Sequence, residues 1–116
     1  MTKILIAEDE QDIRQLIRLS LRLNKMTSVA VQNGAEAVAQ ASETSFDLIL
    51  LDMNMPELNG MEAATRIRYD EGINQETPIL FLTGDPKLEA VPLLNSSVLA
   101  KPFPISKLIS RIRAII

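Results

Sequence analysis

Acidic side chains follow two apolar segments of this 116-residue chain, at the point where each segment ends. Glu8 and Asp9 come directly after the segment 3–7. Asp52 comes directly after the segment 46–51. If the two segments are neighbouring strands, the carboxylates meet at one edge of a sheet and repel one another unless a cation lies between them. Mg²⁺ takes oxygen ligands, usually one or two carboxylates together with phosphate oxygens, so the cluster predicts a magnesium site and phosphoryl chemistry.

A hydroxyl group and an ammonium group follow two further apolar segments. Thr83 comes after the segment 78–82, and Lys101 after the segment 97–100. Both groups suit a phosphoryl group, whose oxygens gather negative charge. Asp52 is the predicted nucleophile, because an aspartate can form an acyl phosphate and the chain contains no His and no Cys. None of these residues is specific alone, but their order, each after a different apolar segment, favours one shared site.

The composition excludes several kinds of chemistry. Without Cys or His the chain has no disulfide, no zinc–thiolate site and no histidine general base. A hydrophobic fraction of 47% beside a charged fraction of 23% predicts one globular domain over residues 1–116. The net charge of −3 disfavours direct nucleic-acid binding. No apolar run approaches the roughly 20 residues of a membrane span, and no leader-like segment opens the chain, so we expect a cytoplasmic protein without membrane insertion.

Short apolar segments alternate with amphipathic ones along the chain. The apolar segments are predicted to be buried strands: 3–7, 27–31, 46–51, 78–82 and 97–100. The other segments are predicted to be helices: 11–25, 35–42, 60–68, 87–94 and 105–116. This alternation predicts an α/β fold, a doubly wound (βα)5 three-layer sandwich around a parallel five-stranded sheet in the order 2-1-3-4-5. Such sheets bind ligands beyond the carboxyl ends of their strands, where the acidic residues lie.

The chain resembles the receiver domain of bacterial response regulators, of the chemotaxis type with a flavodoxin-like fold, over essentially its whole length. The segments that carry the resemblance are ILIAEDE, LILLDMNMPELNGME, PILFLTG and LAKPF. The resemblance implies a two-component phosphorelay in which Asp52 accepts a phosphoryl group from a sensor histidine kinase or a histidine phosphotransfer protein. It implies that Mg²⁺ is required, that contacts with a downstream protein then change, and that outside substrates are not turned over. We expect a monomer or a weak dimer.

The same resemblance assigns the metal ligands. It implies that Asp9 and Asp52 bind Mg²⁺ directly, and that Asn54 contributes its backbone carbonyl. Glu8 would act close to the metal, through a water molecule. From the residues alone, Glu8 and Asp9 could instead cap the helix that begins near residue 11.

The resemblance also assigns roles around the phosphoryl group. Thr83 would donate a hydrogen bond to it and Lys101 would neutralise it. The bond between Lys101 and Pro102 would be cis, as is typical of the family. The side chains of Asn54 and Asp85 are candidates for steering a hydrolytic water.

Three features depart from the family pattern. Glu8 stands where a second aspartate is more usual. Val98 stands three residues before the lysine, where a switch aromatic is usual, so we expect a weaker conformational response in residues 85–100 than in residues 53–60. The interval from the threonine to the lysine is 18 positions, about one helical turn short, and the helix predicted there contains Pro92.

Other functions on the same fold are weighed against this one. An aspartyl-phosphate phosphatase typically carries a second aspartate two residues after its nucleophile, and here that residue is Asn54, which cannot transfer a proton. A nucleotide or flavin binder needs a Gly-rich or hydroxyl-rich loop after the first strand, and the residues here, EDEQ, would repel phosphate. A further alternative concerns context: the chain could be the receiver domain of a larger hybrid kinase or transcriptional regulator.

The predicted helix 11–25 has an apolar side and a basic side. The apolar residues at helical spacing, expected to face the sheet, are Ile13, Leu16, Ile17 and Leu21. The basic side carries three arginines four positions apart: Arg14, Arg18 and Arg22. This row is either a solvated face supported by i,i+4 ion pairs or a docking surface, to which Leu19 and Leu23 add apolar area.

Overall fold

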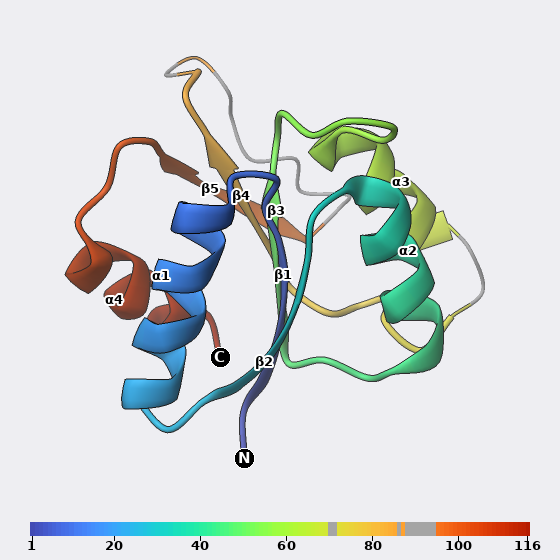
Figure 1. Ribbon diagram of the computed structural model, residues 1–116. Helices are drawn as coiled ribbons and strands as arrows, with labels where there is room; N and C mark the ends of the chain where they lie inside the picture. The colour runs from blue at the N-terminus through green and yellow to red at the C-terminus, as the bar shows by residue number, and fades with distance from the viewer. Residues whose placement is uncertain (70–71, 86, 88–94) are drawn as a thin grey trace.

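The computed structural model describes residues 1–69, 72–85, 87 and 95–116, which surround one parallel five-stranded sheet (Figure 1). The strands are β1 (Lys3–Ala7), β2 (Thr27–Val31), β3 (Leu48–Asp52), β4 (Ile79–Thr83) and β5 (Ser96–Ala100). Their order across the sheet is β2-β1-β3-β4-β5. The described helices are α1 (Gln11–Leu23), α2 (Gly34–Glu43), α3 (Gly60–Tyr69) and α4 (Ile105–Ile115). The predicted parallel sheet and strand order are confirmed, whereas the helix expected over 87–94 lies outside the described residues.

Of the described helices, α1 and α4 cover one face of the sheet, and α2 and α3 cover the other (Figure 1). The strands in the middle of the sheet are apolar throughout because both of their faces are covered. In β3, Leu48 and Leu50 pack in the cluster that includes α1 and α4. Ile49 and Leu51 pack in the cluster that includes α2 and α3. None of the described helices has the length and apolar character needed to cross a membrane.

Two expectations about α1 differ from the structure. Leu16, expected to face the sheet, is 53% exposed, and the buried residues of α1 are Ile17, Ser20 and Leu21. Ser20 is tolerated in the interior because its hydroxyl donates a hydrogen bond to the carbonyl of Leu16 at 2.8 Å. The helix also ends at Leu23, before residue 25, because Lys25 adopts a positive φ of 62°.

The third strand begins two residues later than its apolar run. Phe46 is buried, but its backbone N–H donates to Oδ1 of Asn74 at 2.9 Å, which takes it out of the strand ladder. The Asn74 amide group also donates to the carbonyls of Ala41 and Thr44, both at 2.6 Å. One buried side chain therefore joins the end of α2 to the residues before β3, at the amino-terminal edge of the sheet, opposite the acidic residues.

Close packing of the backbone fixes the loop that follows β3. The N–H of Gly60 donates to the carbonyl of Met53 at 3.0 Å, so the chain doubles back directly after Asp52. A Cβ atom at position 60 would lie 2.6 Å from the carbonyl oxygen of Asp52. Only glycine therefore allows α3 to begin this close to the end of β3, and the loop between them is held against the sheet edge.

Candidate functional site

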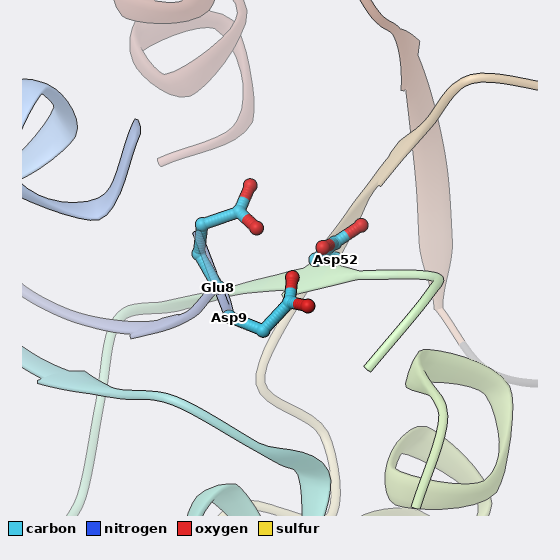
Figure 2. Close-up of side chains that lie close together, drawn as sticks. All are labelled: Glu8, Asp9 and Asp52. Carbon is cyan, nitrogen blue, oxygen red and sulfur yellow. The ribbon is translucent and has the colours of Figure 1, made fainter. Parts of the chain in front are cut away.

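Three carboxylates converge at the carboxyl edge of the sheet. Glu8 and Asp9 follow β1, and Asp52 is the last residue of β3, which pairs with β1 in parallel. One carboxylate oxygen from each residue lies within 4.8 Å of those of the other two. Figure 2 shows the three side chains directed toward a common space from the two strand ends. Glu8 and Asp52 are buried while Asp9 is exposed, so the cluster has a closed side and a side open to solvent.

Lys101 forms ion pairs with two of these carboxylates. Its Nζ lies 2.8 Å from Oε1 of Glu8 and 3.3 Å from Oδ1 of Asp52. The backbone N–H of Lys101 donates to the carbonyl of Thr83 at 2.6 Å, which ties the end of β5 to the end of β4. Burial alone would lower the pKa of Lys101, but the two carboxylates outweigh it and raise the pKa above its usual value. The side chain is therefore a charged ammonium at neutral pH.

The environment of Asp52 disfavours its ionised form. Burial, a hydrogen bond with Glu8 and the negative charge of Glu8 raise the pKa of Asp52 to about 7, in that order of importance. Lys101 lowers this pKa and Asp9 raises it further, both by smaller amounts. A cation among the three carboxylates would lower the pKa of Asp52 and favour its charged form.

The remaining predicted site residues lie on the same edge. Thr83 ends β4, is buried, and its hydroxyl oxygen accepts a hydrogen bond from the N–H of Asp85 at 3.0 Å. The N–H of Asn54 donates to Oδ1 of Asp52 at 3.3 Å, and the side chain of Asn54 is exposed. The cis bond between Lys101 and Pro102 is present.

Sequence reasoning missed the residue that braces the acidic loop. The guanidinium Nη1 of Arg14 donates to the backbone carbonyl of Glu8 at 2.8 Å and to that of Asp9 at 3.4 Å. Backbone acceptors carry no sequence signal, so the arginine row gave no indication of this role. The alternative was that Glu8 or Asp9 caps α1. The N-cap residue is instead Glu10, whose side chain makes no cap bond. Its N–H instead donates to Oε2 of Glu8 at 3.3 Å.

The residue in place of the usual switch aromatic is a short side chain packed into the interior. Val98 is half-buried and contacts the hydrophobic cluster shared by α2 and α3. It has no polar atom and no reach toward the site. The segment between residues 88 and 94, where Pro92 lies, is outside the described residues.

The donor set fits a hard divalent cation. All three clustered groups are carboxylates, and such oxygens are the ligands that Mg²⁺ and Ca²⁺ prefer. Among the described residues, only the Lys101 ammonium pairs with these carboxylates. One positive charge against three negative charges leaves the cluster negatively charged when all three carboxylates are ionised. A metal ion bound there would relieve this repulsion, so the residues present are compatible with the expected cation.

Comparison with known sequences places nearly the whole chain in one family. The model of the response regulator receiver domain matches residues 4–113. The response regulator ArlR of Staphylococcus saprophyticus is 36% identical over 120 residues, covering 100% of this chain and 53% of that protein. The chain therefore spans about half the length of the curated relatives it matches.

Solved structures with the same fold agree with this assignment. The chemotaxis response regulator CheY4 of Vibrio cholerae is 30% identical with a TM-score of 0.91, covering 100% of this chain and 99% of that one. The response regulator TrrA of Thermotoga maritima, solved in complex with Mg²⁺-BeF, is 25% identical with a TM-score of 0.87 and 100% coverage of both chains. A structure of TrrA with the histidine kinase ThkA matches at 25% identity and a TM-score of 0.85, covering 100% of this chain and 99% of that one. The chain belongs to the response regulator receiver domain family.

Proposed function

We propose that Asp52 accepts a phosphoryl group from a phosphohistidine of a sensor histidine kinase or a histidine phosphotransfer protein. The observation that carries this proposal is the meeting of three carboxylates and Lys101 at one sheet edge. In our proposal Mg²⁺ is the cation, held by Asp9, Asp52 and the backbone carbonyl of Asn54, with Glu8 acting through a water. When bound, Mg²⁺ would offset the charge of the cluster and of the phosphoryl oxygens.

The transfer forms one bond and breaks one. A carboxylate oxygen of Asp52 attacks phosphorus, and the bond between phosphorus and the histidine nitrogen breaks, which returns the electron pair to that nitrogen. The product on this chain is an acyl phosphate. Lys101 already lies 3.3 Å from Asp52, so its ammonium can follow the phosphoryl oxygens with little movement. The hydroxyl of Thr83 would donate the second hydrogen bond, since its oxygen only accepts the present one from the N–H of Asp85.

The phosphoryl group is then expected to leave to water, without turnover of outside substrates. Asn54 and Asp85 are the candidates for steering that water, because each follows an active-site strand by two residues and hydrogen-bonds within the site. We propose residues 1–116 as one receiver domain that changes its contacts with a downstream protein. TrrA, solved with the kinase ThkA, supports a histidine kinase as the phosphoryl donor.

Phosphorylation by a small donor tests the proposal without a cognate kinase. Incubation with acetyl phosphate and Mg²⁺ is expected to add one phosphoryl group per chain, measured by intact-protein mass spectrometry, and a chelator should prevent it. Peptide mapping after borohydride reduction should place the group at Asp52. Incorporation at another residue, or equal incorporation without a divalent cation, would contradict the proposal. Steady turnover of p-nitrophenyl phosphate would instead favour the phosphatase alternative.

Replacing Lys101 is expected to separate metal binding from the response to phosphorylation. In Lys101→Ala the ammonium that pairs with Glu8 and Asp52 is lost, so calorimetry should find Mg²⁺ affinity equal to or higher than that of the wild type. The change in amide exchange on adding beryllofluoride should fall to a small fraction of the wild-type change. Lys107→Ala, an exposed lysine of α4, is the matched control. A full response in Lys101→Ala would refute the role of this lysine.

The conformational response to phosphorylation is expected to be concentrated in the loop after Asp52. With Mg²⁺ and beryllofluoride, amide exchange should slow more in residues 53–60 than in residues 95–100. Residues 53–60 contact the phosphoacceptor directly through the N–H of Asn54, whereas Val98 has no group that can turn toward it. Hydrogen exchange with mass spectrometry measures both segments at once. Changes in 95–100 that equal or exceed those in 53–60 would show that the signal leaves by the β5 side after all.

A further inference from the structure

A groove runs along the open edge of the sheet, at the end away from the acidic site. It has a volume of about 580 Å³ and lies between the outer side of α1 and the start of β2. The residues used below line it: Arg18, Leu19, Arg22, Met26, Thr27 and Ser28. β2 pairs only with β1 in the sheet, so its other side is an edge. The groove is thus bounded by a helix on one side and a strand edge on the other.

The charge of the groove is opposite to that of the molecule. The chain carries a net charge of −3, yet Arg18 and Arg22 line the groove and no acidic residue is among its described lining. Neither guanidinium group forms a hydrogen bond or ion pair with the described residues. The residues three and four positions away from each arginine are not acidic. Arg18 and Arg22 therefore cannot form the i,i+4 ion pairs expected of a solvated face. Like charges at this spacing destabilise a helix, and a bound anionic group would offset that cost.

The rest of the lining fits a polypeptide better than a simple anion. Leu19 is 54% exposed beside the arginines, so apolar surface adjoins the positive charge, whereas Met26 is buried. In the neighbouring strand the N–H of Thr27 and the carbonyl of Val31 bond toward β1. Backbone groups alternate in direction along a strand, so those of Ser28 point to the open edge. A strand edge beside a groove with apolar and charged walls suits an added extended segment.

We propose that this groove binds an extended segment of a partner protein in which carboxylates alternate with apolar side chains. Side chains of an extended segment alternate between two faces, so its carboxylates would all face α1 and pair with Arg18 and Arg22, and their methylene groups would lie against Leu19. Arg14 is not part of this surface, because it already bonds the carbonyls of Glu8 and Asp9.

The groove lies at the opposite end of the strands from Asp52. Thr27 pairs with Lys3, the first residue of β1, whereas Glu8 and Asp9 follow its last residue. Four residues of strand separate Lys3 from the end of β1, a distance of about 13 Å. A partner seated in the groove therefore leaves the phosphoacceptor site accessible, and its binding does not depend on phosphorylation. This constitutive docking goes beyond the proposed phosphotransfer function.

A peptide titration tests the proposal on the full chain. The probe is a fluorescein-labelled synthetic peptide in which glutamate alternates with valine, and the control peptide has glutamine in place of glutamate. Fluorescence anisotropy should detect binding of the glutamate peptide and at least about tenfold weaker binding of the glutamine peptide. Arg18→Ala with Arg22→Ala should weaken binding of the glutamate peptide by about tenfold or more. Arg66→Ala with Lys107→Ala removes two exposed cations elsewhere and should leave it unchanged.

Several outcomes would overturn the proposal. Equal losses of affinity in the two double variants would mean that the peptide responds to overall charge. Unchanged affinity in the Arg18 and Arg22 variant would mean that the peptide does not bind in the groove. Tighter binding of a single-stranded DNA oligonucleotide than of the peptide would assign the surface to nucleic acid. Affinity should be the same in Asp52→Asn and with beryllofluoride, and a tenfold change in either would refute independence from the site. Because Asp52→Asn is expected to keep peptide binding, failure here is distinguishable from failure of the phosphotransfer function.

Discussion

Asp52→Asn is expected to take up no phosphoryl group from acetyl phosphate, at any Mg²⁺ concentration at which the wild type is fully modified. An amide oxygen is a poor nucleophile and cannot form the acyl phosphate, and no His or Cys exists in the chain to replace it. The neighbouring carboxylates do not substitute for it, because Glu8 is held by Lys101 at 2.8 Å and Asp9 is exposed to water. Intact-protein mass spectrometry over a time course measures the uptake directly.

A matched variant separates loss of the nucleophile from loss of charge. Asp12→Asn removes one exposed carboxylate from the first turn of α1, outside the cluster, and should be phosphorylated at the wild-type rate. Asp52→Asn should remain folded, since the amide can still bond the N–H of Asn54 through its oxygen. Residual modification of a folded Asp52→Asn protein at a rate near that of the wild type would assign the phosphoryl group to another side chain.

In metal-free solution, Asp52 is expected to reduce the stability of the protein as the pH rises from about 4 to about 7. The folded chain holds the pKa of Asp52 at about 7, against an ordinary value of 3.8. Over that interval the folded state keeps a proton on Asp52 that the unfolded state has lost, so the free energy of unfolding falls with pH. The contribution present below pH 4 is thus lost progressively up to pH 7. One pKa unit corresponds to about 1.4 kcal/mol, so the loss should be roughly 2 to 4 kcal/mol.

Comparison with Asp52→Asn isolates this contribution from those of other carboxylates. Urea unfolding with a chelator should find Asp52→Asn more stable than the wild type by roughly 2 to 4 kcal/mol at pH 7.5 and nearly equal to it at pH 4. Adding Mg²⁺ at pH 7.5 should stabilise the wild type and narrow the difference. Parallel stability profiles for the two proteins between pH 4 and 7.5 would mean that the pKa of Asp52 is not raised.

The fold was predictable because its signals repeat along the chain. Each strand of a doubly covered parallel sheet is a short apolar run, and the run FDLILL, residues 46–51, overlaps β3 although the strand spans Leu48–Asp52. The clustering of the candidate residues was predictable for a related reason, since Glu8, Asp52, Thr83 and Lys101 each directly follow one such run. Parallel strands bring those positions to a single edge, whatever the details of packing.

Features that depend on backbone partners or on the exact rotation of a helix were not predictable. Arg14 bonds two backbone carbonyls, and carbonyls are present at every position. Leu16 has the spacing of an inner residue, but α1 is rotated so that Ser20 takes the inner position and bonds backward to its own helix. Lys101 lies closer to Glu8 than to Asp52, at 2.8 against 3.3 Å, and no motif in the sequence encodes this difference.

Glu8, Asp9 and Asp52 are expected to act around one divalent cation. Titration of the ¹⁵N-labelled protein with Mn²⁺, a paramagnetic substitute for Mg²⁺, measures which amides lie beside the bound ion. The amide signals of residues 8–10 and 52–54 should broaden first, and Mg²⁺ should restore them. The combined Asp9→Asn and Asp52→Asn variant should show no such broadening. Broadening that begins elsewhere, or that persists unchanged in this variant, would contradict this expectation.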